Sequence, residues 1–181
     1  MRTVVSMPGD GIGKVVLPEA IRVLDAVGFE AEYVHGDIGW EFWVTEGDAL
    51  PERTVELLAE HKLGLFGAIT SKPKDEAAAE LGPDLRDQGH VYYSPIVGLR
   101  QRFDLDVCIR PCISFPGNRL NFIRRSADGG FDEPKVNVAV FRQNTEGLYA
   151  GLEWTDPPQQ VYDALATHPK FKNWLQYPKS E

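Results

Sequence analysis

The sequence contains little cysteine, only Cys108 and Cys112 among its 181 residues. If both lie on one strand, their Cα atoms are about 13 Å apart at ~3.3 Å per residue. A disulfide requires Cα atoms within about 7 Å of each other. The spacing therefore excludes a bridge between them on one strand and predicts reduced, buried thiols.

Long hydrophobic runs are also missing. No stretch of about 18 consecutive apolar residues occurs, so the sequence predicts no membrane-spanning helix. The apolar start is interrupted by Pro8 and Gly9, which leaves it too short for the hydrophobic region of a secretion signal. We therefore expect a cytoplasmic protein with no membrane partner.

Basic residues are fewer than acidic residues. The chain has 19 Lys and Arg against 27 Asp and Glu, which gives a net charge of −8 at pH 7. Sequence-independent binding of nucleic acid needs a basic surface, so we expect no nucleic-acid partner. Hydrophobic residues make up 43% of the chain, which is enough for a sizeable core and excludes a wholly disordered protein. The length allows one domain, or a large one and a small one.

The sequence instead contains an alternation of strand and helix patterns. Runs of β-branched and apolar residues predict strands at 3–7, 29–35, 62–69, 105–110, 120–125 and 136–142. Apolar residues spaced three and four apart predict helices at 13–27, around 40–43, at 51–61 and 94–103, and a short one at 76–81 in a polar loop. We expect Pro18 near a first helical turn, Pro111 at a strand end, a loop at 127–134, and a loop and helix at 155–174. This order predicts an α/β fold with an at least partly parallel sheet.

A glycine-rich turn, residues 9–13, follows the first predicted strand and opens a helix. Two interpretations are open. Backbone N–H groups at such a turn form a natural anion site. Alternatively, a tight strand–helix turn needs glycine for backbone reasons alone. The third glycine comes one residue earlier than in the dinucleotide fingerprint G-x-G-x-x-G, so the turn does not match that motif.

Two arginines, Arg110 and Arg142, lie at the ends of predicted strands. Ligands of open α/β sheets bind at that edge. The arginine fork matches the plane of a carboxylate through two parallel N–H···O bonds. Arginines that converge there would suit a ligand with more than one carboxylate. The alternative is that they form ordinary surface pairs with the many acids.

Four motifs in order resemble the isocitrate/isopropylmalate dehydrogenase family, the β-decarboxylating dehydrogenases of 3-substituted malates. They are Met7-Pro8-Gly9-Asp10-Gly11-Ile12-Gly13 with Pro18, Gly67-Ala68-Ile69-Thr70, Leu99-Arg100 through Arg110-Pro111, and Arg142-Gln143-Asn144-Thr145-Glu146-Gly147-Leu148-Tyr149-Ala150-Gly151-Leu152-Glu153-Trp154. The resemblance covers about residues 3–155. Its last motif is more similar to isocitrate dehydrogenases than to isopropylmalate dehydrogenases.

The resemblance implies an incomplete α/β fold of the isocitrate/isopropylmalate dehydrogenase type, which is not the classical Rossmann fold. Residues 1–112 would form the first part of a large α/β domain. Residues 113–181 would begin a smaller, truncated α/β dimerisation domain, and the full-length protein would be a homodimer.

The resemblance also implies roles for individual residues. Substrate carboxylates would be bound by Ser94, Arg100, Arg110 and Arg142. Tyr149 would be the general acid that protonates the enolate after decarboxylation, and a phenol with an ordinary pKa near 10 still carries its proton at pH 7. The nicotinamide cofactor would lie near Ile12 and Thr70.

The implied activity is NAD(P)-dependent oxidative decarboxylation of a small polycarboxylate, first of all isocitrate to 2-oxoglutarate. Isopropylmalate, homoisocitrate and tartrate are the alternative substrates. Ile96 replaces an asparagine by which isocitrate dehydrogenases recognise substrate, and residues 71–93 form a longer loop than in the bacterial isocitrate enzymes. Both departures affect the region that contacts the malate substituent.

The implied cofactors are NAD or NADP and Mg²⁺ or Mn²⁺. The metal ligands have no match in this chain, so we predict no metal-binding residue in it and no activity of the 181 residues alone. A competing interpretation is a non-catalytic, truncated paralogue that binds a polycarboxylate or regulates a full-length enzyme. A third, an unrelated nucleotide-binding module, is disfavoured by the four ordered motifs.

Overall fold

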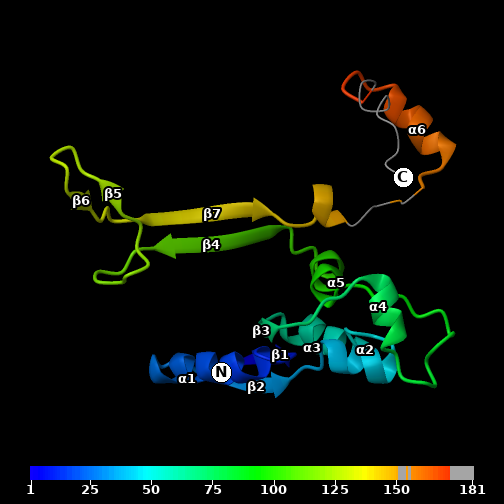
Figure 1. Cartoon of the computed structure of the whole chain (residues 1–181). Coiled ribbons are helices and arrows are strands. Elements are labelled where there is room, and N and C mark those ends of the chain that lie inside the picture. The colour runs from blue at the N-terminus through cyan, green and yellow to red at the C-terminus, as the bar shows by residue number, and fades with distance from the viewer. Residues whose placement is uncertain (151–153, 155, 172–181) are drawn as a thin grey trace. The chain divides into compact units, whose positions relative to one another are not determined.

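The computed structural model describes residues 1–150, 154 and 156–171 (Figure 1). The chain divides into two compact units, Met1–Glu146 and Gly147–Glu181, and each is described by itself. Within the described residues, no helix is both long and apolar enough to cross a membrane.

A parallel sheet forms the centre of the first part of the chain. Its strands are β1 (Arg2–Gly9), β2 (Ala31–His35) and β3 (Gly64–Ala68), in the order β2-β1-β3. Both pairings of β1 are parallel, with Val5 opposite Val34 on one side and Gly64 on the other. Parallel strands need crossover connections, and the helices between these strands supply them. The predicted α/β fold with a parallel sheet is therefore confirmed.

Helices connect and follow these strands. They are α1 (Gly13–Ala26), α2 (Trp40–Glu46), α3 (Glu52–His61), α4 (Lys74–Ala79) and α5 (Pro95–Arg102), close to the predicted ranges. The expectation for Pro18 was wrong, because Pro18 is the sixth residue of α1 and so lies beyond the first turn. The face of α1 that is buried against the sheet contains Gly13 and Leu17, whereas Val23 is exposed.

Two apolar clusters hold this part together. The first consists of Val5, Met7, Ile38, Leu50, Val55, Leu58 and Leu99, and it unites β1, α3 and α5 with the connections between them. The second consists of Trp43, Ala49, Ala77, Leu81 and Tyr92. Burial of such side chains stabilises a fold by roughly 25 cal/mol per Å² of apolar surface. The second cluster fixes the segment after β3, which was predicted only as a polar loop with a short helix.

A long antiparallel pair follows, formed by β4 (Val107–Ile113) and β7 (Asn137–Gln143) (Figure 1). Pro111 does not close β4, contrary to the prediction, but pairs with Ala139 within the strand. Proline is tolerated on a strand that has an open edge, because its missing N–H then removes no ladder bond. In the part of the chain that the structure describes, β4 pairs with β7 alone.

The connection from β4 to β7 differs from the prediction. Only β5 (Arg124–Arg125) is a strand where 120–125 was expected, and it pairs with β6 (Phe131–Asp132) inside the expected loop of 127–134. The turn at Gly117 has a positive φ of 78°, which glycine adopts without strain. The apolar composition of 120–125 predicted a longer strand than the structure contains. Leu120 and Phe122 are exposed and have no strand partner.

Both cysteines lie on β4, and they are free thiols. Cys108 is partly buried and Cys112 is exposed, so the prediction of buried thiols was wrong for Cys112. On a strand, residues four apart share a face. The absence of a bridge between these two residues agrees with their predicted separation.

The second unit contains the 3₁₀ helix η1 (Gly147–Ala150) and the helix α6 (Gln159–Ala166). Helix α6 lies inside the predicted loop and helix of 155–174, and the rest of that prediction extends outside the described residues. The predicted domain boundary between residues 112 and 113 stays a prediction.

Candidate functional site

The glycine turn after β1 is closed by backbone hydrogen bonds. Asp10 N–H donates to the carbonyl of Ala68 at 2.7 Å, and Gly13 N–H donates to the carbonyl of Asp10 at 2.8 Å. A Cβ at Gly13 would lie 2.1 Å from the carbonyl oxygen of Pro8. The sequence needs glycine here because α1 passes so close to the strand backbone.

The first N–H groups of α1 are already used inside this turn. Those of Lys14, Val15 and Val16 donate to the carbonyls of Gly11 and Ile12 at 2.9–3.2 Å. An anion site would need these groups to be available to a ligand. These bonds and the close approach at Gly13 support the backbone interpretation of the glycine turn.

The side chain of Asp10 joins three connections at this edge of the sheet. Its carboxylate accepts the N–H of Trp40 at 2.8 Å and the N–H of Thr70 at 2.9 Å. Gly39, which precedes α2, has a φ of 118°, and a Cβ there would lie 2.6 Å from Asp10 Oδ1. The role of Asp10 could not be predicted from local sequence, because its partners are 30 and 60 residues away.

The two predicted cofactor residues lie at this edge. Ile12 precedes α1 and is 63% exposed, and Thr70 follows β3 and is exposed. Both backbone groups of Thr70 are fixed, since its N–H reaches Asp10 and its carbonyl accepts the hydroxyl of Tyr92 at 3.1 Å. The role of Ile12 and Thr70 beside a nicotinamide ring stays a prediction.

Tyr92 is the buried link between this loop and the next helix. It is 6% exposed, and its ring packs against Trp40 and Trp43 at centroid distances of 5.2 and 5.4 Å. Its hydroxyl also lies 3.3 Å from Ser71 Oγ. Burial raises the pKa of Tyr92 above its ordinary value, because the phenolate would be poorly solvated there.

Ser94 and Arg100 belong to one short element. Ser94 is the N-cap of α5, and its carbonyl accepts the N–H of Gly98 at 3.0 Å, while its side chain makes no capping bond. Arg100 lies in the last turn of α5 and is partly buried. The helix therefore brings two of the predicted substrate residues into one rigid segment.

Arg110 and Arg142 lie on the same face of the β4–β7 pair. Arg110 is opposite Val140, and Arg142 is opposite Cys108. Residues directly opposite share a face, and diagonal neighbours on that face are about 7–8 Å apart. We call this surface the arginine face; it consists of Cys108, Arg110, Cys112, Val138, Val140 and Arg142.

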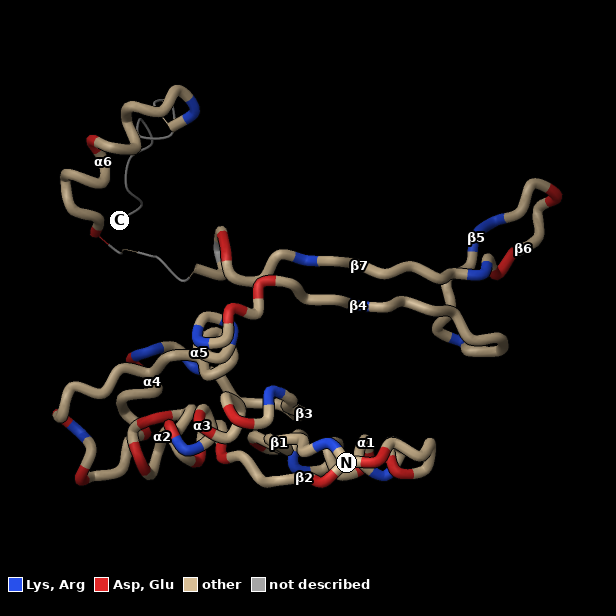
Figure 2. The backbone as a smooth tube through the Cα atoms, turned by 180° about the vertical axis from the view of Figure 1, so that it is seen from behind, with Lys and Arg blue, Asp and Glu red and all other residues tan. Residues whose placement is uncertain are grey.

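The alternative interpretation, an ordinary surface ion pair with an acidic residue, does not apply to Arg110. Other arginines do form such pairs, namely Arg22 with Glu19, Arg53 with Asp37 and Glu46, Arg102 with Glu52, and Arg124 with Asp132. Arg110 is exposed and takes part in none of the ion pairs among the described residues. Figure 2 shows the general pattern, in which red and blue segments are interspersed along the first helices.

Asn144 orients Arg142 and was not singled out from the sequence. Its side chain is 6% exposed, its Oδ1 accepts Arg142 Nη2 at 2.8 Å, and its Nδ2 donates to the carbonyl of Leu105 at 3.2 Å. Leu105 N–H in turn donates to the carbonyl of Arg100 at 2.9 Å. These bonds connect the end of α5 to the end of β7. Asn144 belongs to the fourth motif, and membership of that motif is the sequence signal from which its role could have been predicted.

Tyr149 lies in η1, in the second unit, and is 37% exposed. Its role as general acid stays a prediction. Three residues of its motif, Gly151, Leu152 and Glu153, lie outside the described residues.

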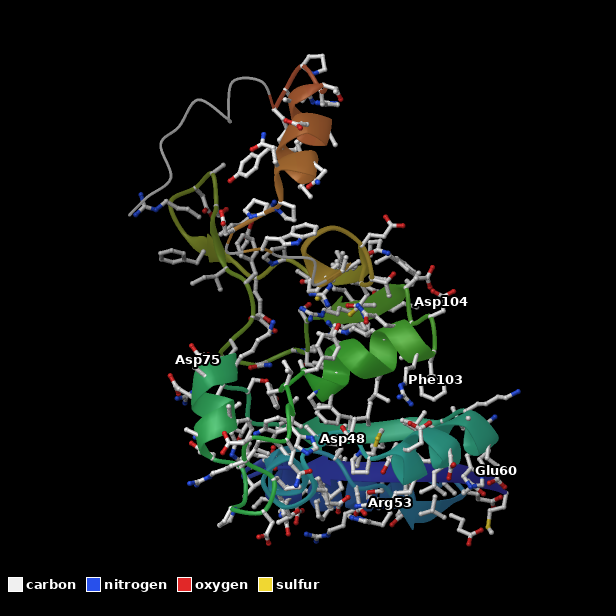
Figure 3. The ribbon with its side chains drawn as sticks, turned by 90° about the vertical axis from the view of Figure 1, so that its right-hand side faces the viewer. Asp48, Arg53, Glu60, Asp75, Phe103 and Asp104 are labelled. Atoms are coloured by element: carbon white, nitrogen blue, oxygen red, sulfur yellow. The ribbon has the colours of Figure 1, made fainter. Side chains whose placement is uncertain are left out.

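No group of three or more His, Cys, Asp or Glu side chains within the described ranges could hold a metal ion. A hollow of about 390 Å³ lies between β2 and α3, where it is lined by His35, Asp37, Arg53, Glu56 and Glu60. Arg53 and Glu60 are labelled in Figure 3, and none of the predicted site residues lines this hollow.

Comparisons with known proteins point to one family. The family model described as isocitrate/isopropylmalate dehydrogenase matches residues 3–170. Homoisocitrate dehydrogenase of Methanocaldococcus jannaschii is 40% identical over 168 residues, which are 92% of this chain and 44% of that protein. Protein DlpA of Legionella pneumophila is 37% identical over 175 residues, which are 97% of this chain and 26% of DlpA.

Among solved structures, isocitrate dehydrogenase from Methylococcus capsulatus has the same fold over 88% of this chain and 40% of its own, with a TM-score of 0.64 and 28% identity. The chain thus spans less than half the length of these relatives. The matched range contains the glycine turn, α5 and both arginines of the arginine face. The chain belongs to the isocitrate/isopropylmalate dehydrogenase family.

Proposed function

We propose that this chain supplies the substrate-carboxylate site of a β-decarboxylating dehydrogenase. The reaction is the NAD(P)-dependent oxidative decarboxylation of a 3-substituted malate, with isocitrate as the first choice. The observation that carries the proposal is the position of Arg110 and Arg142 as diagonal neighbours on one face of β4 and β7.

The arginine face suits a ligand that has two carboxylates. Each guanidinium can donate two parallel N–H···O bonds to one carboxylate. The malate core carries two such groups, and a spacing of about 7–8 Å between strand positions lets two long side chains converge on them. Arg110 is exposed, so its charge is accessible to a ligand.

Ser94 and Arg100 would extend this site from α5. The bonds from Arg100 through Leu105 to Asn144 support a shared geometry, because Asn144 also binds Arg142. Ser94 would contact the substituent of the malate.

Isocitrate remains the first choice despite Ile96. The side chain of Ile96 is partly buried and packs against the first apolar cluster. Core packing therefore accounts for an apolar residue at this position without requiring an apolar substituent on the substrate. Homoisocitrate, isopropylmalate and tartrate are the alternatives, and the relative from Methanocaldococcus jannaschii is a homoisocitrate dehydrogenase.

Tyr149 would donate the proton to the enolate, and Ile12 and Thr70 would lie beside the nicotinamide ring. NAD or NADP, when bound, would accept the hydride from the substrate. The fixed backbone of Thr70 supports this assignment, since a rigid loop can hold a ring in one orientation. We further propose that the full-length protein is a homodimer.

Calorimetric titration of the chain with isocitrate tests the proposed site. We expect Arg110→Gln to weaken binding at least about tenfold, since a hydrogen-bonded charge contributes about 1.5–3 kcal/mol. Arg119→Gln is the matched control, because it removes the same charge from an exposed position outside the arginine face. Equal affinities of the two variants, or no binding by the unaltered chain, would contradict the proposal. Titrations with homoisocitrate, isopropylmalate and tartrate then compare the affinities of the chain for the different malate substituents.

A further inference from the structure

The arginine face carries two thiols as well as two arginines. Side chains alternate along a strand, so Cys108, Arg110 and Cys112 project from the same side of β4. The residue opposite Cys108 on β7 is Arg142. Each thiol therefore has an arginine close by on its own face, and Arg110 lies between the two.

The spacings place an arginine within reach of each sulfur. Cα atoms two apart on a strand are separated by about 6.6 Å. Cβ atoms of directly opposite residues are about 4.5–5.5 Å apart. The two cysteines themselves are too far apart along β4 for a bridge to each other.

Accessibility differs between the thiols. Cys112 is exposed and Cys108 is partly buried, and both are free. The thiol of Cys112 makes one long contact, of 3.9 Å, to the carbonyl of Arg110. Reaction with a small reagent therefore needs no opening of the sheet at Cys112.

We propose that the arginine face is also a thiol-modification site, which takes small disulfides that carry carboxylates, such as glutathione disulfide. A thiol beside arginines meets anionic reagents at a raised local concentration, because the positive charges attract them. Carboxylates of the bound reagent would face Arg110 and Arg142. The expectation that a polycarboxylate competes for these arginines rests on the proposed function.

The reaction is a thiol–disulfide exchange. The cysteine thiol gives its proton to solvent, and the thiolate sulfur attacks one sulfur of the reagent. A new S–S bond forms, the S–S bond of the reagent breaks, and the leaving thiolate keeps the electron pair. The protein thiol is oxidised and half of the reagent is reduced, so no further oxidant is required.

Two reagents of different charge test the role of the arginines. Dithiobisnitrobenzoate is a dianion with one carboxylate on each half, and dithiodipyridine is neutral. The ratio of their rates with the chain measures the attraction of the anion separately from the intrinsic reactivity of the thiol. We expect Arg110→Gln to lower this ratio about threefold or more at low salt, by the loss of one charge about 7 Å away in water. The effect should shrink at high ionic strength.

Arg119→Gln again serves as the control, since it changes the net charge equally. A ratio that falls to the same extent in both variants would overturn the proposal, because net charge alone would then explain it. Cys112→Ser and Cys108→Ser assign the fast and slow phases, and we expect Cys112 to react faster. Mass spectrometry after incubation with glutathione disulfide should show an adduct on Cys112.

Isocitrate separates this inference from the proposed function. We expect it to slow the modification of the unaltered chain. If Arg110→Gln lowers the rate ratio but isocitrate gives no protection, the modification site stands and the proposed substrate site fails. If isocitrate protects but the ratio is the same in Arg110→Gln and the unaltered chain, the substrate site stands and the modification site fails.

Discussion

The carboxylate of Asp10 and the backbone N–H of Thr70 are joined by a 2.9 Å hydrogen bond that spans 60 residues of sequence. The same carboxylate accepts the N–H of Trp40 at the start of α2. Asp10 thereby fixes the glycine turn, the start of α2 and the loop after β3 to one another. The exposed side chains of Ile12 and Thr70 stand on this fixed backbone.

Replacement of Asp10 by alanine is expected to lower the free energy of unfolding by about 2–4 kcal/mol, since backbone N–H groups of Trp40 and Thr70 lose a charged acceptor. Urea unfolding followed by tryptophan fluorescence measures it. Asp25→Ala, at an exposed position near the end of α1, should change the value by no more than about 0.5 kcal/mol. Similar losses in both variants would mean that the Asp10 contacts contribute little.

Two glycines of the same turn should respond differently to alanine. At Gly13 a Cβ would lie 2.1 Å from the carbonyl of Pro8 and 2.5 Å from the nitrogen of Ala68, so the backbone must move. At Gly11 nothing lies within 4 Å, and only the positive φ of 47° opposes a side chain, at a cost of about 1–2 kcal/mol. We expect Gly13→Ala to destabilise the chain by at least about 2 kcal/mol more than Gly11→Ala. Thermal unfolding of the pair measures the difference, and equal midpoints would disprove the close approach.

Removal of the Tyr92 hydroxyl should destabilise the loop after β3. Tyr92→Phe loses the bond to the carbonyl of Thr70 and the contact with Ser71, while the ring keeps its packing on Trp40 and Trp43. We expect a loss of about 1–3 kcal/mol at neutral pH, because a carbonyl is left without its donor. Tyr93→Phe, at an exposed neighbour, is the control, and an equal loss there would contradict the role of Tyr92.

The pH dependence of stability should also depend on Tyr92. Its pKa is raised by burial, so the folded state keeps the phenol proton at a pH where the unfolded state has begun to release it. Stability from this group is complete below the unfolded pKa of about 10 and is lost as the pH rises above it. Between about pH 9 and about pH 11, the unaltered chain should therefore lose more stability than Tyr92→Phe. Parallel curves for the two proteins would show that Tyr92 does not titrate differently on folding.

The chain by itself is predicted not to reduce NAD or NADP when given isocitrate and Mn²⁺. The reason is that no metal-binding residue of the family was matched in its sequence. Absorbance of the reduced nicotinamide measures the reaction. Measurable turnover that copurifies with the chain and falls in Arg110→Gln would refute this prediction. Binding of isocitrate without turnover would be the behaviour of the non-catalytic, polycarboxylate-binding alternative.

Local patterns were sufficient for most elements of the first part of the chain. β1, α1 and α3 follow directly from apolar spacing, because a strand or helix that packs on one core repeats its apolar residues with its own period. The ordered motifs were sufficient for the family, which the family match confirms. Arg110 and Arg142 stood out by their place at the ends of predicted strands, whereas Ser94 and Arg100 could be selected only through that resemblance.

Local patterns did not predict which distant segments pair with each other. From the sequence alone, Pro111 indicates the end of a strand, but its pairing with β7 shows that the strand continues. The composition of 120–125 likewise predicts a strand, although its apolar residues Leu120 and Phe122 have no strand partner. The local sequence indicates nothing special about Asn144, which is one residue of a motif, or about Tyr92, which lies in a predicted loop. Their importance depends on partners that are 39 and 22 residues away.

The sequence by itself therefore determined the parallel α/β class, the order of the elements and the family, because these follow from local periodicity and from motifs in a fixed order. Only the tertiary structure decided that Arg110 and Arg142 share a face with both cysteines, since a shift of one residue in the β4–β7 register would place one arginine on the opposite side. It also decided the purpose of the glycine turn. The N–H groups of Asp10 and Gly13 are bonded within the protein, and the carboxylate of Asp10 fixes the loop that carries Thr70.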